Sequence, residues 1–201
     1  MVAKQAENPV VTIAEHRRSD YRFTKNYITP YIPQWTAHLG RFKGRPNVHF
    51  LEVGSFEGCT ATWFLDNILT GEGSTITCID IFESPDYEAR FDHNVAVSGH
   101  AGRLTKFRGR SQDILPTLVG RRFDGMYIDG GHTAAEVYAD ASLCWPMLKP
   151  GGVVTFDDYE WRMHRTPDAR PQQGIDRFLE EHKGELRILH KAYTLVAERT
   201  T

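Results

Sequence analysis

Short apolar runs alternate with longer segments of helical periodicity from residue 49 to the end of the chain, and this alternation constrains the fold more than any other feature. The apolar runs, which we predict to be strands, are 49–53, 75–79, 104–108, 125–128, 153–156, 186–189 and 194–197. The helical segments between them are 59–69, 113–119, 134–148 and 175–182. Strands that alternate with helices form a parallel sheet covered on both faces.

The last two apolar runs are joined by only four residues, 190–193. They must pair in an antiparallel manner, because a parallel crossover needs a dozen or more residues. We therefore predict an α/β fold with a doubly wound, mostly parallel seven-stranded sheet and a terminal antiparallel strand. The chain of 201 residues has the length of one ordinary domain.

The beginning of the chain follows a different pattern. Residues 1–18 are polar and unpatterned, and we expect them to form a mobile arm. Residues 21–42 have helical periodicity, which Pro30 and Pro33 should interrupt.

Charge divides the chain at the same place. Residues 1–48 carry eight Lys/Arg against three Asp/Glu, and residues 49–201 carry 16 against 23, so the formal net charge of -2 averages a basic and an acidic region. We predict that 1–48 caps the substrate or contacts a second subunit in a homodimer, and that 49–201 is the main domain. A charge near zero argues against a nucleic-acid partner, which a strongly basic face would attract.

Composition also indicates a cellular compartment. The three cysteines, Cys59, Cys78 and Cys144, form neither a disulfide framework nor a close metal-ligand pair, as expected of reduced thiols inside a cell. No run of 18 apolar residues exists and the N-terminus lacks a signal-peptide pattern, so we expect a cytoplasmic protein with no membrane contact. Arg outnumbers Lys 17 to 7, a bias typical of a GC-rich bacterial genome.

The segment after the first predicted strand is glycine-rich. Open α/β sheets bind ligands at the carboxyl ends of their strands, and here Gly54 and Gly58 permit a tight turn and a close approach of the backbone to a ligand. Phe56 and Cys59 replace the second and third glycines of the dinucleotide fingerprint, so we expect a smaller ligand. A strand–helix turn without any ligand is the alternative.

Two further segments complete a candidate nucleoside site. Asp80 ends the second strand, where its carboxylate could accept both hydroxyls of a ribose, or could instead stabilise a turn. After the third strand, Gln112 could form a hydrogen bond with an adenine edge, and Ser111 is a good helix N-cap. The three features on successive strands favour a nucleoside more strongly than any one of them.

In the glycine-rich turn, Asp80 and the segment with Ser111 and Gln112, the chain resembles the class I S-adenosylmethionine-dependent methyltransferases. The resemblance extends over about residues 48–198. The segment Gly-Arg-Ser-Gln-Asp-Ile-Leu-Pro (109–116) looks like the adenine-binding segment of catechol O-methyltransferase. The resemblance implies that 49–201 is a Rossmann-like methyltransferase domain that takes S-adenosylmethionine as co-substrate. The implied cofactor-binding residues are Glu52, Gly54, Ser55, Phe56, Gly58, Thr60, Asp80, Ser111, Gln112 and Asp129.

Three carboxylates follow the next two strands. Asp129 comes after the fourth strand, and Asp157 and Asp158 come after the fifth. Adjacent strands lie about 4.8 Å apart, so these anions should converge and repel one another. Mg²⁺ would relieve the repulsion, because it prefers carboxylate oxygens, and the absence of thiolates disfavours zinc. The alternative is that Asp129 or Asp158 caps a helix while Asp157 pairs with a basic side chain.

His132 stands three residues after Asp129 and is the candidate general base. Imidazole can remove the proton of an acceptor hydroxyl near neutral pH, although a histidine at a helix start often has only a capping role. The pattern Asp129-x-x-His132 followed by Gly-Gly-Val-Val-Thr-Phe-Asp-Asp-Tyr (151–159) resembles bacterial metal-dependent sugar O-methyltransferases of the macrocin O-methyltransferase type. The resemblance implies that Asp129 and Asp157/Asp158 hold Mg²⁺ and that Asp129 and His132 are catalytic.

We therefore expect methyl transfer to a hydroxyl of a small polyhydroxylated acceptor, such as a sugar, glycoside or polysaccharide precursor. Catechol O-methyltransferase has similar metal positions but a lysine base, so a catechol or phenol is the alternative acceptor. A non-catalytic nucleoside-binding protein is the alternative of another class. Acceptor specificity should come from irregular segments, namely the N-terminal helices, 82–102, and 160–172 with Trp161, Arg162, His164, Arg165 and Arg170.

Overall fold

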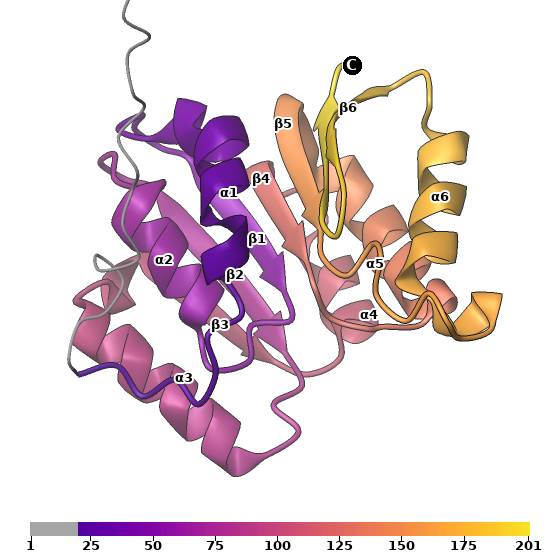
Figure 1. Cartoon of the computed structure of the whole chain (residues 1–201). Helices are drawn as coiled ribbons and strands as arrows, with labels where there is room; N and C mark the ends of the chain where they lie inside the picture. Colours follow the sequence, from indigo (N-terminus) through magenta and orange to yellow (C-terminus); the bar gives the residue numbers. More distant parts are fainter. Residues whose placement is uncertain (1–19) are drawn as a thin grey trace, which may run out of the picture.

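The computed structural model describes residues 20–201, so the arm predicted at 1–18 lies outside the described residues. The sheet of this part consists of β1 (His49–Val53), β2 (Thr75–Asp80), β3 (Leu104–Arg108), β4 (Phe123–Ile128), β5 (Leu148–Phe156), β6 (Leu186–Lys191) and β7 (Leu195–Arg199) (Figure 1). The strand order is β3-β2-β1-β4-β5-β7-β6, and β7 runs antiparallel to both of its neighbours. The predicted doubly wound, seven-stranded sheet with a terminal antiparallel strand is confirmed.

Helices cover both faces of this sheet. The α-helices are α1 (Ile32–Leu39), α2 (Cys59–Asn67), α3 (Pro85–Ser98), α4 (Ser111–Ile114), α5 (Ala134–Cys144) and α6 (Pro171–Glu181). Short 3₁₀ turns are η2 (Thr29–Tyr31), η3 (Gly40–Phe42), η4 (Ala101–Arg103), η5 (Leu115–Leu118), η6 (Trp145–Met147) and η7 (Pro167–Ala169). None of the helices between residues 20 and 201 is long and apolar enough to cross a membrane.

The strands contribute alternate side chains to two hydrophobic cores, as the two-residue period of a strand requires. Phe50 and Tyr127 face the core beneath α1, α2 and α3, whereas Leu51 and Met126 face the core beneath α5 and α6. Both faces of the central strands are therefore largely apolar.

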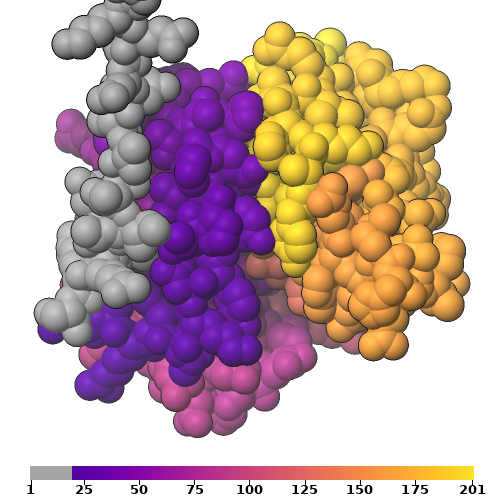
Figure 2. Space-filling view, viewed as in Figure 1, coloured from indigo at the N-terminus to yellow at the C-terminus, as the bar shows by residue number. Residues whose placement is uncertain are grey.

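The N-terminal helices pack tightly against the sheet. Trp35 on α1 is fully buried, and its ring lies 5.4 Å from that of Trp63 and 5.1 Å from that of Phe64. Gln34 forms a hydrogen bond with the hydroxyl of Thr194, and α1 lies beside the C-terminal hairpin of β6 and β7 (Figure 2). The two ends of the described chain therefore meet on one face of the molecule.

The prolines of this region begin helices and do not interrupt one. Pro30 lies in the first turn of η2 and Pro33 in the first turn of α1. A proline is tolerated there because the first N–H groups of a helix have no partner within it.

The segment 82–102 is mostly helical, and the prediction of an irregular segment there is wrong. Ser84 caps α3 by accepting a hydrogen bond from the N–H of Asp86 at 3.2 Å, and Gly99 ends the helix with φ of +77°. Asn94 and Ser98 belong to its buried face, so the apolar periodicity that would identify the helix is weak. The helical segment predicted at 134–148 is too long, since α5 ends at Cys144 and β5 already begins at Leu148.

Candidate functional site

The order of the strands reverses between β1 and β4, and open α/β sheets bind ligands at the carboxyl ends of strands where such a reversal occurs. We call the region at these strand ends the crevice. The N–H of Asp129 donates to the carbonyl of Val53 at 2.8 Å, which joins the ends of the two strands. Gly54 has φ of +86°, and a Cβ atom there would lie 2.0 Å from the carbonyl oxygen of Asp129. Only glycine allows this approach, so the glycine turn lies against Asp129.

The rest of the glycine turn leads into α2. Phe56 has a positive φ of +46°, and the N–H of Gly58 donates to the carbonyl of Ser55 at 2.8 Å. Gly58 has φ of +80°, and a Cβ atom there would lie 3.1 Å from the ring of Phe91. Thr60 is the second residue of α2 and stands beside this turn.

Asp80 holds the glycine turn in place. Its Oδ2 atom accepts hydrogen bonds from the N–H groups of Ser55 at 2.7 Å and Phe56 at 2.8 Å, and its Oδ1 atom accepts one from Phe82 at 2.6 Å. The turn-stabilising alternative is therefore present in the structure. Oδ1 keeps one lone pair for a further donor, such as a ribose hydroxyl.

A buried carboxyl group lies beneath the turn. Glu52 is fully buried between Cys78 of β2 and Tyr127 of β4. Neither of its oxygens accepts a hydrogen bond of standard geometry, and the nearest donors are the Ser55 hydroxyl and the Cys78 thiol. The hydroxyl of Ser55 is likewise buried. Burial raises the pKa of Glu52 to about 7. Buried polar groups are normally satisfied, so this pair could receive a polar group of a ligand.

The segment after β3 is connected to the same crevice. The N–H of Gly109 donates to the carbonyl of Asp80 at 2.8 Å. Arg110, not Ser111, is the N-cap of α4, so the predicted capping role of Ser111 is wrong, and the helix begins two residues earlier than predicted. The Ser111 hydroxyl and the Gln112 side-chain amide instead donate to Oδ1 of Asp140, at 2.6 and 2.7 Å.

Asp140 is a site residue that the sequence reasoning missed. It lies on α5 among Val137, Ala141 and Cys144, which form the buried face of that helix. An acidic residue at an apolar position of an amphipathic helix was the available signal, because such a residue is rarely buried without a specific partner.

The acids after β4 and β5 converge, as their positions predict, and His132 lies in the same group. Ligand atoms of Asp129, His132 and Asp158 all lie within 4.8 Å of one another. Nδ1 of His132 is 3.2 Å from Oδ2 of Asp158, whose Oδ1 accepts a hydrogen bond from the hydroxyl of Tyr193 at 2.8 Å. We call Asp129, His132 and Asp158 the acid–histidine cluster.

Asp157 lies beside the acid–histidine cluster and has other partners. Its oxygens accept hydrogen bonds from the hydroxyl of Tyr127 at 2.6 Å and from the N–H of Asp158 at 2.8 Å. The alternative that Asp157 pairs with a basic side chain is therefore not what the structure has. Its pKa is raised to about 6 because it is buried.

The helix after the cluster has its own cap. Thr133 and Glu136 form a reciprocal capping box at the start of α5. Neither Asp129 nor His132 caps this helix, so both side chains are available to a ligand. Asp158 adopts a left-handed φ of +59°, which is uncommon for a residue with a side chain and often occurs at functional sites.

The electrostatics of the cluster favour a cation. Partial burial, followed by the charges of Asp157 and Asp158, raises the pKa of Asp129 well above its ordinary value. Burial and the charges of Asp157, Asp158 and Asp129 raise the pKa of Tyr31 to about 12, which keeps its hydroxyl protonated. A divalent cation would remove the repulsion among these groups.

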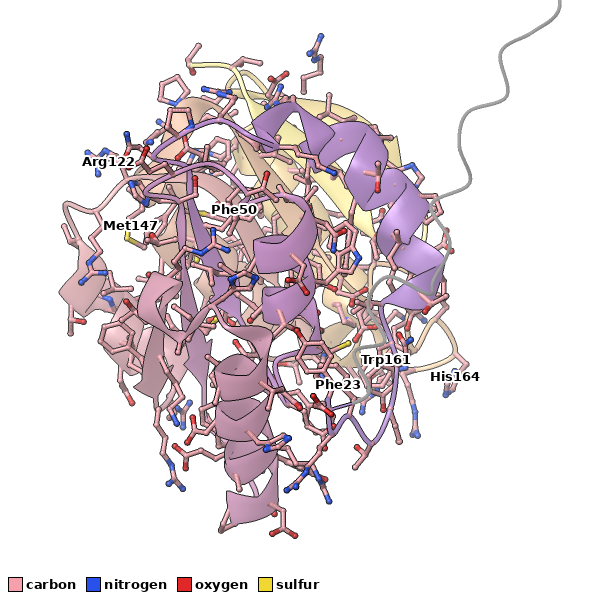
Figure 3. The ribbon with its side chains drawn as sticks, turned by 90° about the vertical axis from the view of Figure 1, so that its left-hand side faces the viewer. Phe23, Phe50, Arg122, Met147, Trp161 and His164 are labelled. Atoms are coloured by element: carbon pink, nitrogen blue, oxygen red, sulfur yellow. The ribbon has the colours of Figure 1, made fainter. Side chains whose placement is uncertain are left out.

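Aromatic rings surround the cluster. Tyr31 stacks on Tyr193 with ring centroids 5.8 Å apart and an angle of 13° between the planes. The ring centroids of Trp161 and His132 lie 4.9 Å apart with an angle of 69° between the planes, and the guanidinium of Arg162 lies 3.8 Å from the ring centre of Trp161. Figure 3 shows Trp161 and His164 at the end of the molecule opposite Arg122 and Met147, which precede β4 and β5.

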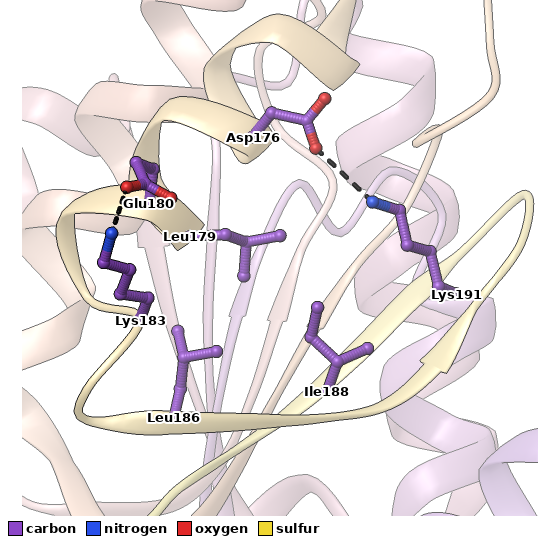
Figure 4. A pocket seen from close by; sticks show the side chains of 7 residues that line it. All are labelled: Asp176, Leu179, Glu180, Lys183, Leu186, Ile188 and Lys191. Carbon is purple, nitrogen blue, oxygen red and sulfur yellow. Dashed lines mark hydrogen bonds and ion pairs between the residues drawn. The ribbon is translucent and has the colours of Figure 1, made fainter.

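A separate hollow lies between α6 and β6 (Figure 4) and is lined by Asp176, Leu179, Glu180, Lys183, Leu186, Ile188 and Lys191. Its charges are already paired, since Lys191 lies 3.7 Å from Asp176 and Lys183 lies 2.5 Å from Glu180. It contains neither a histidine nor a cysteine, so the chemistry is concentrated in the crevice between β1 and β4.

Comparison with known proteins agrees with this location. A family model described as a methyltransferase domain matches residues 51–159, more than half of the chain. A curated relative named "Putative O-methyltransferase", from Mycobacteroides abscessus, is 25% identical over 150 residues. The match covers 74% of this chain and 65% of the relative, so this chain spans less than two thirds of the relative's length.

Solved structures share the fold. The O-methyltransferase TomG from Streptomyces achromogenes, involved in tomaymycin synthesis and solved with SAM, has a TM-score of 0.66 at 20% identity over 84% of this chain and 80% of its own. The MycE methyltransferase of the mycinamycin biosynthetic pathway, solved with Mg and SAH, has a TM-score of 0.65 at 15% identity over 93% of this chain and 53% of its own. At these identities the likeness establishes the architecture alone.

The buried carboxyl group of Glu52 leads to a test of stability. Its pKa of about 7 exceeds the ordinary 4.5, so the folded state keeps a proton that the unfolded state loses. This contribution to stability is complete below about pH 4.5 and is lost as the pH rises to about 7. The shift corresponds to roughly 3 kcal/mol at 1.36 kcal/mol per unit. Glu52→Gln should therefore flatten the decline in the free energy of unfolding between pH 5 and pH 7, measured by urea denaturation.

The matched control is Glu72→Gln, at an exposed glutamate, which should leave the decline unchanged. An equal decline in the wild type and in Glu52→Gln would contradict the raised pKa of Glu52.

Proposed function

The chain belongs to the family of the methyltransferase domain, and from this premise we propose that it transfers a methyl group from S-adenosylmethionine to a hydroxyl oxygen. The acceptor that we propose is a small polyhydroxylated molecule, such as a sugar, a glycoside or a polysaccharide precursor. The observation that carries the proposal is the single crevice, in which the glycine turn after β1 lies directly against Asp129 of the acid–histidine cluster.

The nucleoside half of the crevice would bind the adenosyl group. We propose that Asp80 accepts a hydrogen bond from the ribose, and that Ser111 and Gln112 contact the adenine. The methionine part would lie along the turn, near Gly54, Ser55, Phe56, Gly58 and Thr60. The buried carboxyl of Glu52 and the neighbouring hydroxyl of Ser55 support a polar ligand at this place.

The donor set of the acid–histidine cluster fits a divalent cation such as Mg²⁺. We propose that Asp129 and Asp158 hold the ion, and that Asp157 supports them by fixing the backbone of Asp158 through the hydrogen bond at 2.8 Å. When bound, the ion would polarise the acceptor hydroxyl and lower its pKa. The raised pKa of Asp129 supports this assignment, because a cation at this position would return the group to its charged form.

We propose that His132 is the general base. Its Nδ1 atom lies 3.2 Å from Asp158, which would orient the imidazole and leave Nε2 to take the proton from the acceptor hydroxyl. The acceptor oxygen would then form a bond to the methyl carbon as the bond from that carbon to sulfur breaks. Alignment of the oxygen, the methyl carbon and the sulfur supplies much of the rate enhancement. The ring of Trp161 packs against the ring of His132 and restricts its orientation.

The walls of the cluster are suited to a ring with polar substituents. Tyr31, Tyr193 and Trp161 offer aromatic surface, while Arg162 and His132 offer hydrogen-bond donors. The same surface could stack on a catechol, so a phenolic acceptor is the second candidate. The alternative of a nucleoside-binding protein without activity does not explain why acids converge beside a histidine. For residues 1–48 we propose a role as a cap over the substrate or as a contact between the subunits of a homodimer.

A direct test is turnover by the full chain with S-adenosylmethionine and Mg²⁺ on a panel of sugars, glycosides and catechols, followed by mass spectrometry. We expect the mass shift of one methyl group on members of the sugar panel. Turnover of catechols alone would establish the phenolic alternative. Binding of S-adenosylhomocysteine without turnover of any acceptor would favour the binding protein.

Removal of the metal should abolish turnover. We expect EDTA to stop the reaction and added Mg²⁺ to restore it. In calorimetric titrations with Mn²⁺, Asp129→Asn and Asp158→Asn should each weaken binding by at least about 10-fold, since altered metal surroundings commonly cost that much. Asp124→Asn, which alters an acid paired with Lys149 at 2.8 Å, is the control. Activity that is insensitive to chelation would exclude the metal.

Replacement of the base should slow the chemical step. His132→Ala should lower kcat by about 10²- to 10⁴-fold, the usual contribution of a general base. Affinity for S-adenosylhomocysteine and for Mn²⁺ should stay within about two-fold, whereas weaker Mn²⁺ binding would make His132 a metal ligand. His93→Ala, on α3, is the control. A kcat near that of the wild type would place the base elsewhere.

A further inference from the structure

Asp140 is a buried acid that the proposed chemistry leaves unused. It is fully buried on α5, and its described partners are neutral donors, the hydroxyl of Ser111 and the side-chain amide of Gln112. No ion pair to Asp140 exists in the described part of the chain. Burial raises its pKa to about 6, so above that pH the group is a carboxylate and can only accept hydrogen bonds.

This property determines how the amide of Gln112 is oriented. The NH₂ group must face the carboxylate, at 2.7 Å, because an amide oxygen cannot donate. The amide oxygen therefore points away from Asp140. Gln112 is half-buried, and its amide oxygen accepts no hydrogen bond from any residue between 20 and 201. The amide oxygen of Gln112 is thus a hydrogen-bond acceptor that is held in a fixed direction.

The amide stands at the nucleoside half of the crevice. Gln112 is the second residue of α4, and the turn before it is fastened to Asp80 by the hydrogen bond from Gly109 at 2.8 Å. The other side of Asp140 faces the loop after β4, where a Cβ atom on Gly130 would lie 3.2 Å from Oδ2 of Asp140. Asp140 therefore lies between the turn after β3 and the loop that carries Asp129.

We propose that Asp140 is a positioning residue that holds the oxygen of the Gln112 amide toward the ligand, and that this orientation selects a purine with a 6-amino group over one with a 6-oxo group. The inference rests on the proposed function, in which Gln112 contacts the adenine. A 6-amino group donates to the amide oxygen, whereas a 6-oxo group would place two acceptors against each other.

The test compares S-adenosylhomocysteine with its deaminated analogue S-inosylhomocysteine, in which a 6-oxo group replaces the 6-amino group and the adjacent N1 carries a proton. Calorimetric titration at pH 8 keeps Asp140 ionised. We expect the wild type to bind the adenine compound about 10- to 100-fold more tightly, the range that one well-placed pair of hydrogen-bonding groups supplies. Asp140→Asn offers Gln112 either an oxygen or an NH₂ group, so both amide orientations become possible, and the preference should fall by at least about 10-fold.

Asp140→Ser, whose hydroxyl also either donates or accepts, should lower the preference in the same way and guards against a folding defect in the first variant. Asp113→Asn, at an exposed acid on α4 adjacent to Gln112, is the matched control and should keep the preference of the wild type.

The outcomes separate this inference from the proposed function. If the wild type binds neither ligand, the proposed function fails and the inference fails with it. If the wild type binds S-adenosylhomocysteine but Asp140→Asn keeps the same preference, the inference is overturned and the proposed function stands. An equal loss of affinity for both ligands would make Asp140 a structural residue and would also overturn the inference.

Discussion

The backbones of Gly54 and Asp129 touch where β1 and β4 end, and the arrangement of the crevice depends on that contact. A Cβ atom at Gly54 would lie 2.0 Å from the carbonyl oxygen of Asp129, so any other residue would push the two strand ends apart. Asp80 holds the far side of the glycine turn through the N–H groups of Ser55 and Phe56. The contact therefore sets the distance between the nucleoside half of the crevice and the acid–histidine cluster.

The burial of acidic side chains around the crevice lowers the stability of the folded protein. Burial raises the pKa values of Glu52, Asp140 and Asp157 to about 7, 6 and 6, and the partners that the described residues supply are neutral donors. Such groups cost stability unless a ligand compensates them. Ligands that bind only the folded state add stability, which grows with the logarithm of the ligand concentration relative to its Kd. The free-energy cost of burying these acids is thus concentrated at the place where a bound ligand can reduce it.

The sheet and the position of the crevice could be predicted because both follow from short-range patterns and strand order. Gly54 and Asp129 stand directly after apolar runs, and the topology of parallel strands brings those ends together. The helix α3 was missed because Asn94 and Ser98 occupy part of its buried face. Asp140 was missed because its partners lie 28 and 29 residues away in the chain, and only the packing of α5 brings them within reach.

The wall of the crevice joins the two ends of the described chain. Tyr31 stacks on Tyr193, and Arg41 lies 2.5 Å from Glu198, so each pair consists of one early and one late residue. During synthesis on the ribosome, α1 can bury Trp35 against α2 long before β7 has emerged. The aromatic wall can close only after Tyr193 has left the exit tunnel, because its stacking on Tyr31 is a long-range contact. A ribosome-bound chain would thus hold a nearly complete sheet while its crevice is still open.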